Sequence, residues 1–140
     1  MKIILGALAI TLVTNLMAQP MLDISSTKKL CGNAAYEFGN GNYRVAFDSL
    51  KPFWELPDAE IDNISYQSES QLKMASARFG KAIGSEYIKT ETIGKSMTKH
   101  TYIAKRENTA LRFMCVFYKA KNEWKVNSVS FDDEIKALFK

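Results

Sequence analysis

The sequence predicts an α+β protein, with three N-terminal helices packed on a curved four-stranded antiparallel sheet and a short C-terminal helix. Apolar residues recur at helical spacing up to about residue 79. After Gly80 the chain changes to short runs rich in aromatic and β-branched residues, separated by turn signals. The short connections favour an antiparallel meander. A chain of 140 residues suffices for one such domain and not for two.

The first half of the chain predicts three helices. Their expected spans are about 25–38, 43–51 and 58–79. Ser25, Ser26 and Thr27 offer N-cap oxygens for the first helix, and Asp58 offers one for the third. Pro52 disfavours helical geometry at the residue before it, so the second helix ends or kinks there. An apolar connector then leads to the third helix: Phe53, Trp54 and Leu56.

The second half predicts four strands. They are Glu86–Thr92, His100–Lys105, Leu111–Tyr118 and Trp124–Phe131. The third strand is apolar at the centre of both faces; one face carries Leu111, Phe113, Cys115 and Phe117, and the other carries Arg112, Met114, Val116 and Tyr118. A strand exposed on one side alternates apolar with polar residues, so this strand is expected to be covered on both sides. The helices cover one side, and a second copy of the chain is the economical cover for the other. We therefore predict a homodimer through the sheet.

Residues 1–18 have the layout of an export signal. Met1–Lys2 is a short positive end, residues 3–13 are nearly all apolar, and the expected cut follows Ala18. The apolar run of about 12 residues is well short of the roughly 20 that span a bilayer, which argues against a retained anchor. The sequence therefore predicts a periplasmic or secreted protein with no stable membrane span after cleavage, and a single mature domain over residues 19–140.

Cys31 and Cys115 are an even pair, and export would place them in an oxidising compartment. Cys31 lies in the expected first helix and Cys115 at the centre of the third strand, so the two meet if that helix packs on that strand. A disulfide is one interpretation. We favour the other, two buried free thiols that act as small apolar residues. The sequence does not supply the Cα separation of about 4.4–6.8 Å that a disulfide needs.

His100 is the only histidine, and it falls at the expected start of a strand. We predict an exposed side chain there rather than a general base, which needs an orienting carboxylate. One histidine and two separated cysteines do not make a zinc site, so neither a metal nor a cofactor is expected. The acids Asp132, Asp133 and Glu134 are interpreted as helix N-terminal residues rather than metal ligands.

Tyr102 and Arg112 fall on neighbouring expected strands. If they share a face, they line a cavity between helices and sheet and bind a polar or anionic ligand. We favour a different role for Arg112, as an ion-pair partner at a sheet edge or an interface. Glu91 lies in the middle of an expected strand, and it is the acid that would act inside such a cavity if the chain were an enzyme.

The stretch Phe117–Lys119, a short loop, Trp124–Val126 and Phe131–Asp133 is similar to the final hairpin of cystatin-like and nuclear-transport-factor-two-like α+β domains. It also resembles the end of small exported bacterial proteins of unknown function, over roughly residues 58–140. The resemblance implies a cone-shaped fold. Enzymes of that superfamily, such as ketosteroid isomerase and the polyketide cyclases, bury an acid in the cone, and no motif here matches theirs residue by residue.

The net charge of +4 is mild, and the basic residues are scattered, so nucleic-acid binding is disfavoured. The chain contains no nucleophile motif and no phosphate-binding glycine loop. We expect an exported, non-enzymatic binding or interaction domain whose ligand is a small apolar molecule or a protein partner. The first alternative is a small ketosteroid-isomerase-like or cyclase-like enzyme that uses a carboxylate in the cone. A secreted effector that binds a host protein is a third.

Overall fold

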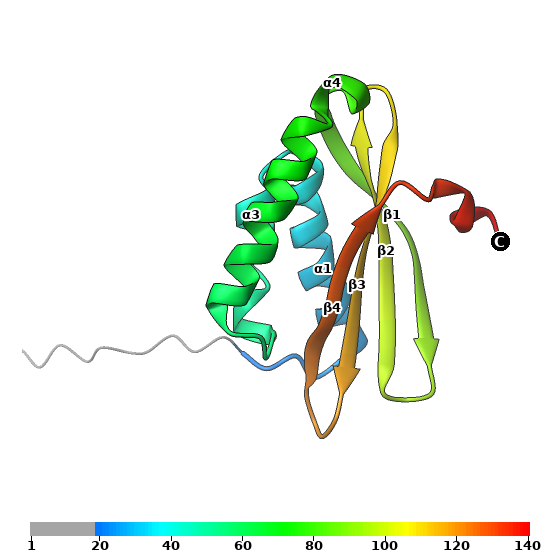
Figure 1. Cartoon of the computed structure of the whole chain (residues 1–140). Coiled ribbons are helices and arrows are strands. Elements are labelled where there is room, and N and C mark those ends of the chain that lie inside the picture. The colour runs from blue at the N-terminus through cyan, green and yellow to red at the C-terminus, as the bar shows by residue number, and fades with distance from the viewer. Residues whose placement is uncertain (1–18) are drawn as a thin grey trace, which may run out of the picture.

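The computed structural model describes residues 19–140, so the predicted export signal lies outside the described residues. The fold is α+β, as predicted, with helices packed on a four-stranded antiparallel sheet (Figure 1). The elements are, in chain order, α1 (Ile24–Gly39), α2 (Tyr43–Asp48), the 3-10 turn η1 (Lys51–Phe53), α3 (Asp58–Met74), α4 (Ser76–Phe79), β1 (Ala82–Ile93), β2 (Met97–Arg106), β3 (Ala110–Lys119), β4 (Trp124–Asp132) and the 3-10 turn η2 (Ile135–Phe139).

The strands follow one another across the sheet in the order β1-β2-β3-β4, which is the predicted meander. The sheet does not close, so β1 and β4 are its two edges. The helices lie on one side of the sheet, and the C-terminal turn η2 lies on the other (Figure 1). Helix α1 contacts the sheet directly, whereas α3 packs on α2. Within residues 19–140, no helix combines the length and the apolar character needed to cross a membrane.

The helix starts differ from the sequence prediction. Asp23 is the N-cap of α1, and its Oδ1 accepts the N–H of Ser26 at 2.7 Å. Ser25, Ser26 and Thr27 therefore lie in the first turn, because the carboxylate three residues before Ser26 already supplies the capping oxygen. Asp58 is also inside its helix, as the first residue of α3 after Pro57. Its negative charge there interacts favourably with the positive N-terminal end of the helix dipole.

Aromatic rings fill the space between α1 and the sheet. The ring of Phe38 lies 4.8 Å from that of Phe113 and 5.0 Å from that of Phe131, measured between centroids. The last turn of α1 also meets β1 so closely that a Cβ at Gly39 would collide with the carbonyl oxygen of Gly84. The interface between α1 and the sheet is therefore packed with side chains and backbone.

The residues of β3 divide between the two faces of the sheet as the sequence predicted. The outer face, however, is largely covered within a single chain. Met114 pairs with Thr101 on one side and Ser130 on the other, and it is only 9% exposed within a single chain. The C-terminal turn η2 contacts β3 as well. This face therefore does not require a second copy to bury its centre, and the homodimer stays a prediction.

Candidate functional site: a groove at the β4 edge

Tyr102 and Arg112 lie on opposite faces of the sheet. In the β2–β3 register Tyr102 is opposite Phe113, and Ile103 is opposite Arg112. Tyr102 faces the helices, where its hydroxyl donates to the carbonyl oxygen of Lys28 at 3.3 Å and burial raises its pKa. The two residues therefore do not share a face, and the cavity lining that depended on a shared face is wrong.

Arg112 is an ion-pair partner, the role we favoured from the sequence. Its Nε and Nη2 each donate to a different carboxylate oxygen of Asp132 at 2.7 Å, and Glu134 Oε2 lies 3.7 Å from Nη2. The two parallel bonds hold the pKa of Asp132 below its usual range. Asp132 is the last residue of β4 and the partner of Arg112. Residues 19–140 contain no cluster of acids, cysteines and histidine that could hold a metal ion.

Glu91 lies on the outer face of the sheet, away from the helices. Its side chain is 48% exposed and pairs with Lys89 at 3.6 Å and Lys99 at 3.4 Å. No carboxylate is buried among residues 19–140. Glu91 is therefore excluded as an acid inside a cavity between helices and sheet.

His100 is fully buried, so the prediction of an exposed histidine is wrong. Strand β2 begins at Met97, three residues earlier than expected, and this places His100 well inside the strand and facing α1. Burial is the main reason why the pKa of His100 falls to about 4, and the nearby charge of Lys28 lowers it further. The histidine is thus neutral over the ordinary pH range.

A directed chain of hydrogen bonds runs through His100. Thr27 Oγ1 donates to the Ile24 carbonyl oxygen at 2.6 Å, so it can only accept from His100 Nε2, 2.8 Å away. His100 Nδ1 must then accept from Thr90 Oγ1 at 2.7 Å, and Thr90 accepts in turn from the hydroxyl of Tyr87 at 2.7 Å. Every donor in this chain has an acceptor. The arrangement joins helix to sheet and leaves His100 no free lone pair for catalysis.

Cys31 and Cys115 are joined by a disulfide, with their Cα atoms 6.0 Å apart. Neither is free, so the free-thiol interpretation that we favoured is wrong. The reason is packing: α1 lies across the inner face of the sheet, where Cys115 points between Phe113 and Phe117. Both cysteines are fully buried, which makes the bond part of the core.

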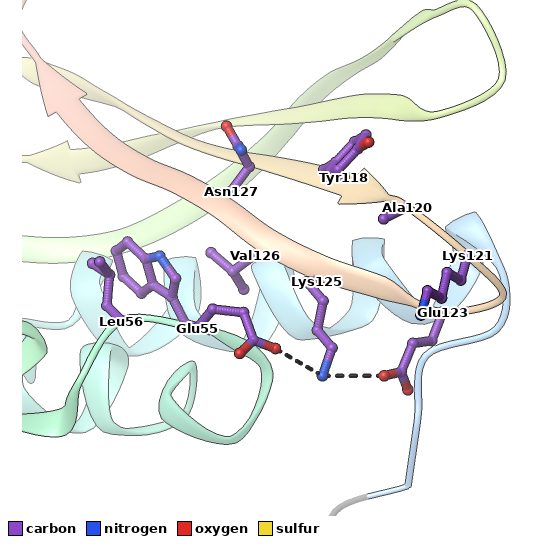
Figure 2. Close-up of a pocket in the computed structure, with 10 residues that line it drawn as sticks. Glu55, Leu56, Tyr118, Ala120, Lys121, Glu123, Lys125, Val126 and Asn127 are labelled. Atoms are coloured by element: carbon purple, nitrogen blue, oxygen red, sulfur yellow. Dashed lines mark ion pairs between the residues drawn. The ribbon is translucent and has the colours of Figure 1, made fainter.

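A groove lies where β4 meets the connector between α2 and α3, and we call it the edge groove. Its volume is about 490 Å³, and it is lined by Trp54, Glu55, Leu56, Tyr118, Ala120, Lys121, Glu123, Lys125, Val126 and Asn127. Figure 2 shows Tyr118 and Asn127 on one side of the β4 ribbon and Glu55, Leu56 and Lys125 on the other. The groove thus reaches around the edge of the sheet.

Two local features shape the edge groove. Pro52 stands within the short turn η1, after which Trp54 takes an extended conformation and forms a parallel bridge with Val126. The β3–β4 register shifts next to Val126, which leaves Asn127 as an extra residue. The bridge brings Trp54 to the strand, and the bulge bends the edge beside it.

The polar rim of the edge groove is balanced in charge. Lys125 Nζ lies 3.2 Å from a carboxylate oxygen of Glu123 and 3.2 Å from one of Glu55, as the dashed lines in Figure 2 show. Glu123, which has the larger effect, and Glu55 together raise the pKa of Lys125. The walls are apolar because they include the aromatic rings of Trp54, which is half-buried, and of Tyr118, which is 43% exposed. The groove therefore offers an apolar surface between paired charges.

The backbone of β4 is largely unpaired on its outer edge. The N–H of Trp124 donates to the carbonyl oxygen of Met21 at 2.8 Å. Residues 127–132 make no further backbone hydrogen bond, within the described part of the chain, beyond their ladder with β3. Donors and acceptors of the strand are thus available beside the edge groove.

Sequence reasoning missed the edge groove. It predicted the segment around Trp54 only as an apolar connector, and it placed Tyr118 on the outer face without a neighbour. The usable signal was the sequence Phe53–Leu56, where a tryptophan follows Pro52 in a segment too short to bury it within a helix. No family model, curated protein or solved structure matches the chain. The cystatin-like and nuclear-transport-factor-two-like resemblance therefore stays a prediction.

Proposed function

We propose that this protein is an exported binding domain that takes an extended peptide segment of a partner protein along β4, with one apolar side chain in the edge groove. The observation that carries the proposal is that Trp54 and Tyr118 both line the edge groove beside an unpaired strand edge. An exposed edge is a template for an added strand, whose backbone supplies the bonds while pockets select its side chains. Export is supported by the pattern of residues 1–18 and by the buried disulfide.

The edge of β4 already accepts strand-like neighbours from its own chain. Met21 pairs with Trp124 in antiparallel fashion, and Trp54 pairs with Val126 in parallel fashion. A peptide that pairs with residues 127–132 would continue this row in the same plane. The occupant we propose thus extends an arrangement that the fold already uses.

The other edge of the sheet is less suited to such pairing. Strand β1 carries two register shifts where β4 carries one, and its charged side chains include Glu86, Lys89 and Glu91, whereas Asp132 is the only charged residue of the β4 stretch 127–132. Bulges and charged side chains are the usual protection of an edge strand. The difference favours β4 as the binding edge.

The size and charge of the edge groove indicate what it accepts. A volume of about 490 Å³ falls within the range of ligand pockets, about 300–1,000 Å³. Because Lys125 is already paired with Glu55 and Glu123, a charged side chain would have to displace one of these partners. We therefore expect an apolar or aromatic side chain that carries no charge.

The enzyme alternative gains no support from the site. A ketosteroid-isomerase-like mechanism needs a carboxylate in the cone, and Glu91 lies outside it. His100 is locked between two threonine hydroxyls. We therefore keep the binding domain as the proposal and do not develop the enzyme further.

Selection from a displayed library of random peptides, with the purified exported protein as bait, tests the proposal. We expect enriched peptides to share an uncharged apolar residue and to bind less tightly, by about tenfold or more, to Tyr118→Ala. Tyr36→Ala is the matched control, since Tyr36 is 62% exposed on α1, outside the edge groove. Equal binding by the Tyr118→Ala variant would contradict the proposal. So would a stable dimer that Ser128→Pro dissociates, because a second copy would then occupy this edge.

A further inference from the structure

Arg106, the last residue of β2, is a buried guanidinium without a carboxylate partner. It is 8% exposed, and its Nε and Nη2 both donate to the carbonyl oxygen of Gly80, at 3.1 and 2.8 Å. Its Nη1 donates to the hydroxyl of Tyr43 at 2.8 Å. Among residues 19–140, no acid lies within ion-pair distance of Arg106. A buried arginine is usually paired, so this one is an exception within the fold.

Arg106 and Tyr43 have hydrogen-bond donors that no described residue accepts. A guanidinium has five N–H groups, and Arg106 uses three of them. Tyr43 accepts from Arg106, so its own hydrogen is free to donate, and the described residues supply no acceptor for it. Two N–H groups of Arg106 and the O–H of Tyr43 are thus left as donors.

An open hollow of about 500 Å³ lies beside these donors. Arg106 and Tyr43 line it, together with Ala77 of α4, Lys81 and Glu107. Gly80 shapes it: its φ is +79°, and a Cβ at this position would meet the Cβ of Glu107 at 2.8 Å. Glycine at this position therefore lets the chain turn closely enough for its carbonyl oxygen to accept two bonds from Arg106.

The charges around the hollow favour an anion. Two cations line it, Arg106 and Lys81, against a single acid, Glu107. Glu107 is engaged elsewhere, since its Oε1 accepts the backbone N–H of Lys81 at 2.9 Å. Within the described part of the chain, no carboxylate, Glu107 included, forms an ion pair with Arg106.

We propose that this hollow binds an oxyanion group, a carboxylate or a phosphate carried by a ligand, with Arg106 and Tyr43 as the donors. Arginine suits such groups because its planar donors match two oxygens at once. The hollow lies beside α4, whereas the edge groove lies near the β3–β4 hairpin at the other end of the sheet (Figure 1). The proposal is thus independent of the peptide proposal, and either can fail alone.

The test is an NMR titration of the full mature protein with inorganic phosphate and, separately, with acetate, at ionic strength held constant with chloride. We expect saturable shifts of the backbone amides that border the hollow, those of Gly41, Gly80 and Lys81. The anion that saturates at the lower concentration identifies the group. Shifts that do not saturate, or that follow the lysines across the surface, would overturn the proposal.

Ala77 offers a matched pair of variants that leave Arg106 in place. Ala77 is exposed and lines the hollow, so Ala77→Glu places a carboxylate beside Arg106, and Ala77→Gln places a neutral side chain of the same size there. We expect Ala77→Glu to raise Tm and to abolish the phosphate shifts, and Ala77→Gln to do neither. The same Tm and the same phosphate response in both variants would show that Arg106 only holds Gly80 and Tyr43 together.

Discussion

His100 Nε2 lies 2.8 Å from Thr27 Oγ1, and this bond joins the central sheet to the first turn of α1 across 73 residues of sequence. Thr27 has one hydroxyl hydrogen, and the carbonyl oxygen of Ile24 takes it. The imidazole must therefore carry its hydrogen on Nε2 and accept at Nδ1 from Thr90. A second proton on Nδ1 would turn that acceptor into a donor facing Thr90.

Stability is expected to fall between pH 6.5 and pH 4 because of His100. The ordinary pKa of histidine is 6.5, and burial lowers that of His100 to about 4 in the folded state. Between these values the unfolded chain binds a proton that the folded chain does not. The free energy of unfolding is therefore full above pH 6.5 and drops by about 3 kcal/mol in total as the pH falls to about 4. Urea unfolding at a series of pH values measures this drop.

His100→Gln is the control for this drop. Glutamine has a donor and an acceptor but does not titrate, and the chain contains no other histidine. The variant is expected to be less stable at neutral pH and to show a much flatter stability profile between pH 6.5 and pH 4.5. An unchanged slope in His100→Gln would show that other groups cause the pH dependence.

Loss of the disulfide is expected to destabilise the fold strongly. The bond joins residues 84 apart, and closing a loop of that length contributes about 4 to 5 kcal/mol in the chain-entropy account. We expect the Cys31→Ala and Cys115→Ala double variant to lose about that much free energy of unfolding. Denaturant titration measures the loss, and a loss below about 1 kcal/mol would contradict the prediction. Mass spectrometry without reductant should show the wild type lacking two thiol hydrogens.

The pair Arg112 and Asp132 should contribute to stability through geometry as well as charge. Two bonds of 2.7 Å align the guanidinium with both carboxylate oxygens. We expect Arg112→Lys to cost about 1 kcal/mol although the charge is kept, because lysine cannot reproduce the two parallel bonds. Thermal unfolding against Lys95→Arg, a substitution in the β1–β2 turn, provides the comparison. Equal stability of Arg112→Lys and the wild type would assign the pair no geometric contribution.

Ser65 is expected to be a site where a substitution stabilises the protein. Its Oγ is buried in α3 and has no hydrogen-bond partner among the described residues. Ser65→Ala removes the unsatisfied hydroxyl and adds a better helix former, so the free energy of unfolding should rise by about 1 kcal/mol. Ser68→Ala is the control, because the Ser68 hydroxyl donates to the Ile64 carbonyl oxygen at 2.7 Å. A destabilised Ser65→Ala would show that the hydroxyl has a partner in solution.

The fold class follows from the sequence because periodicity and turn residues are local signals. The change of period after Gly80 predicted helices before it and strands after it, and the structure agrees. The face of each residue along β3 was also predictable, since alternation is fixed within one strand. Registers between strands are not local, and a slip of one residue exchanges the faces. Whether Tyr102 and Arg112 share a face was left open for that reason.

The candidate sites depend on contacts between distant segments. His100 was predicted to be exposed because a start of β2 at Met97 rather than at His100 cannot be read from the sequence Lys95–Lys99. Trp54 and Tyr118 reach the same groove only because a connector bridges to the far strand. Arg106 was not singled out, since a lone arginine at a strand end is ordinary until its lack of an acid is known.

The burial of Cys31 and Cys115 imposes an order of events on the making of this protein. Both sulfur atoms are sealed in the finished core, so no oxidant reaches them once α1 lies on the sheet. The thiols must therefore be oxidised while the chain is still open, after β3 has been synthesised and before the helix settles. The burial that keeps oxidants away from the two sulfur atoms also keeps reductants away from the finished disulfide. A reductant has no access to the bond unless the domain opens, so its lifetime is that of the folded state itself.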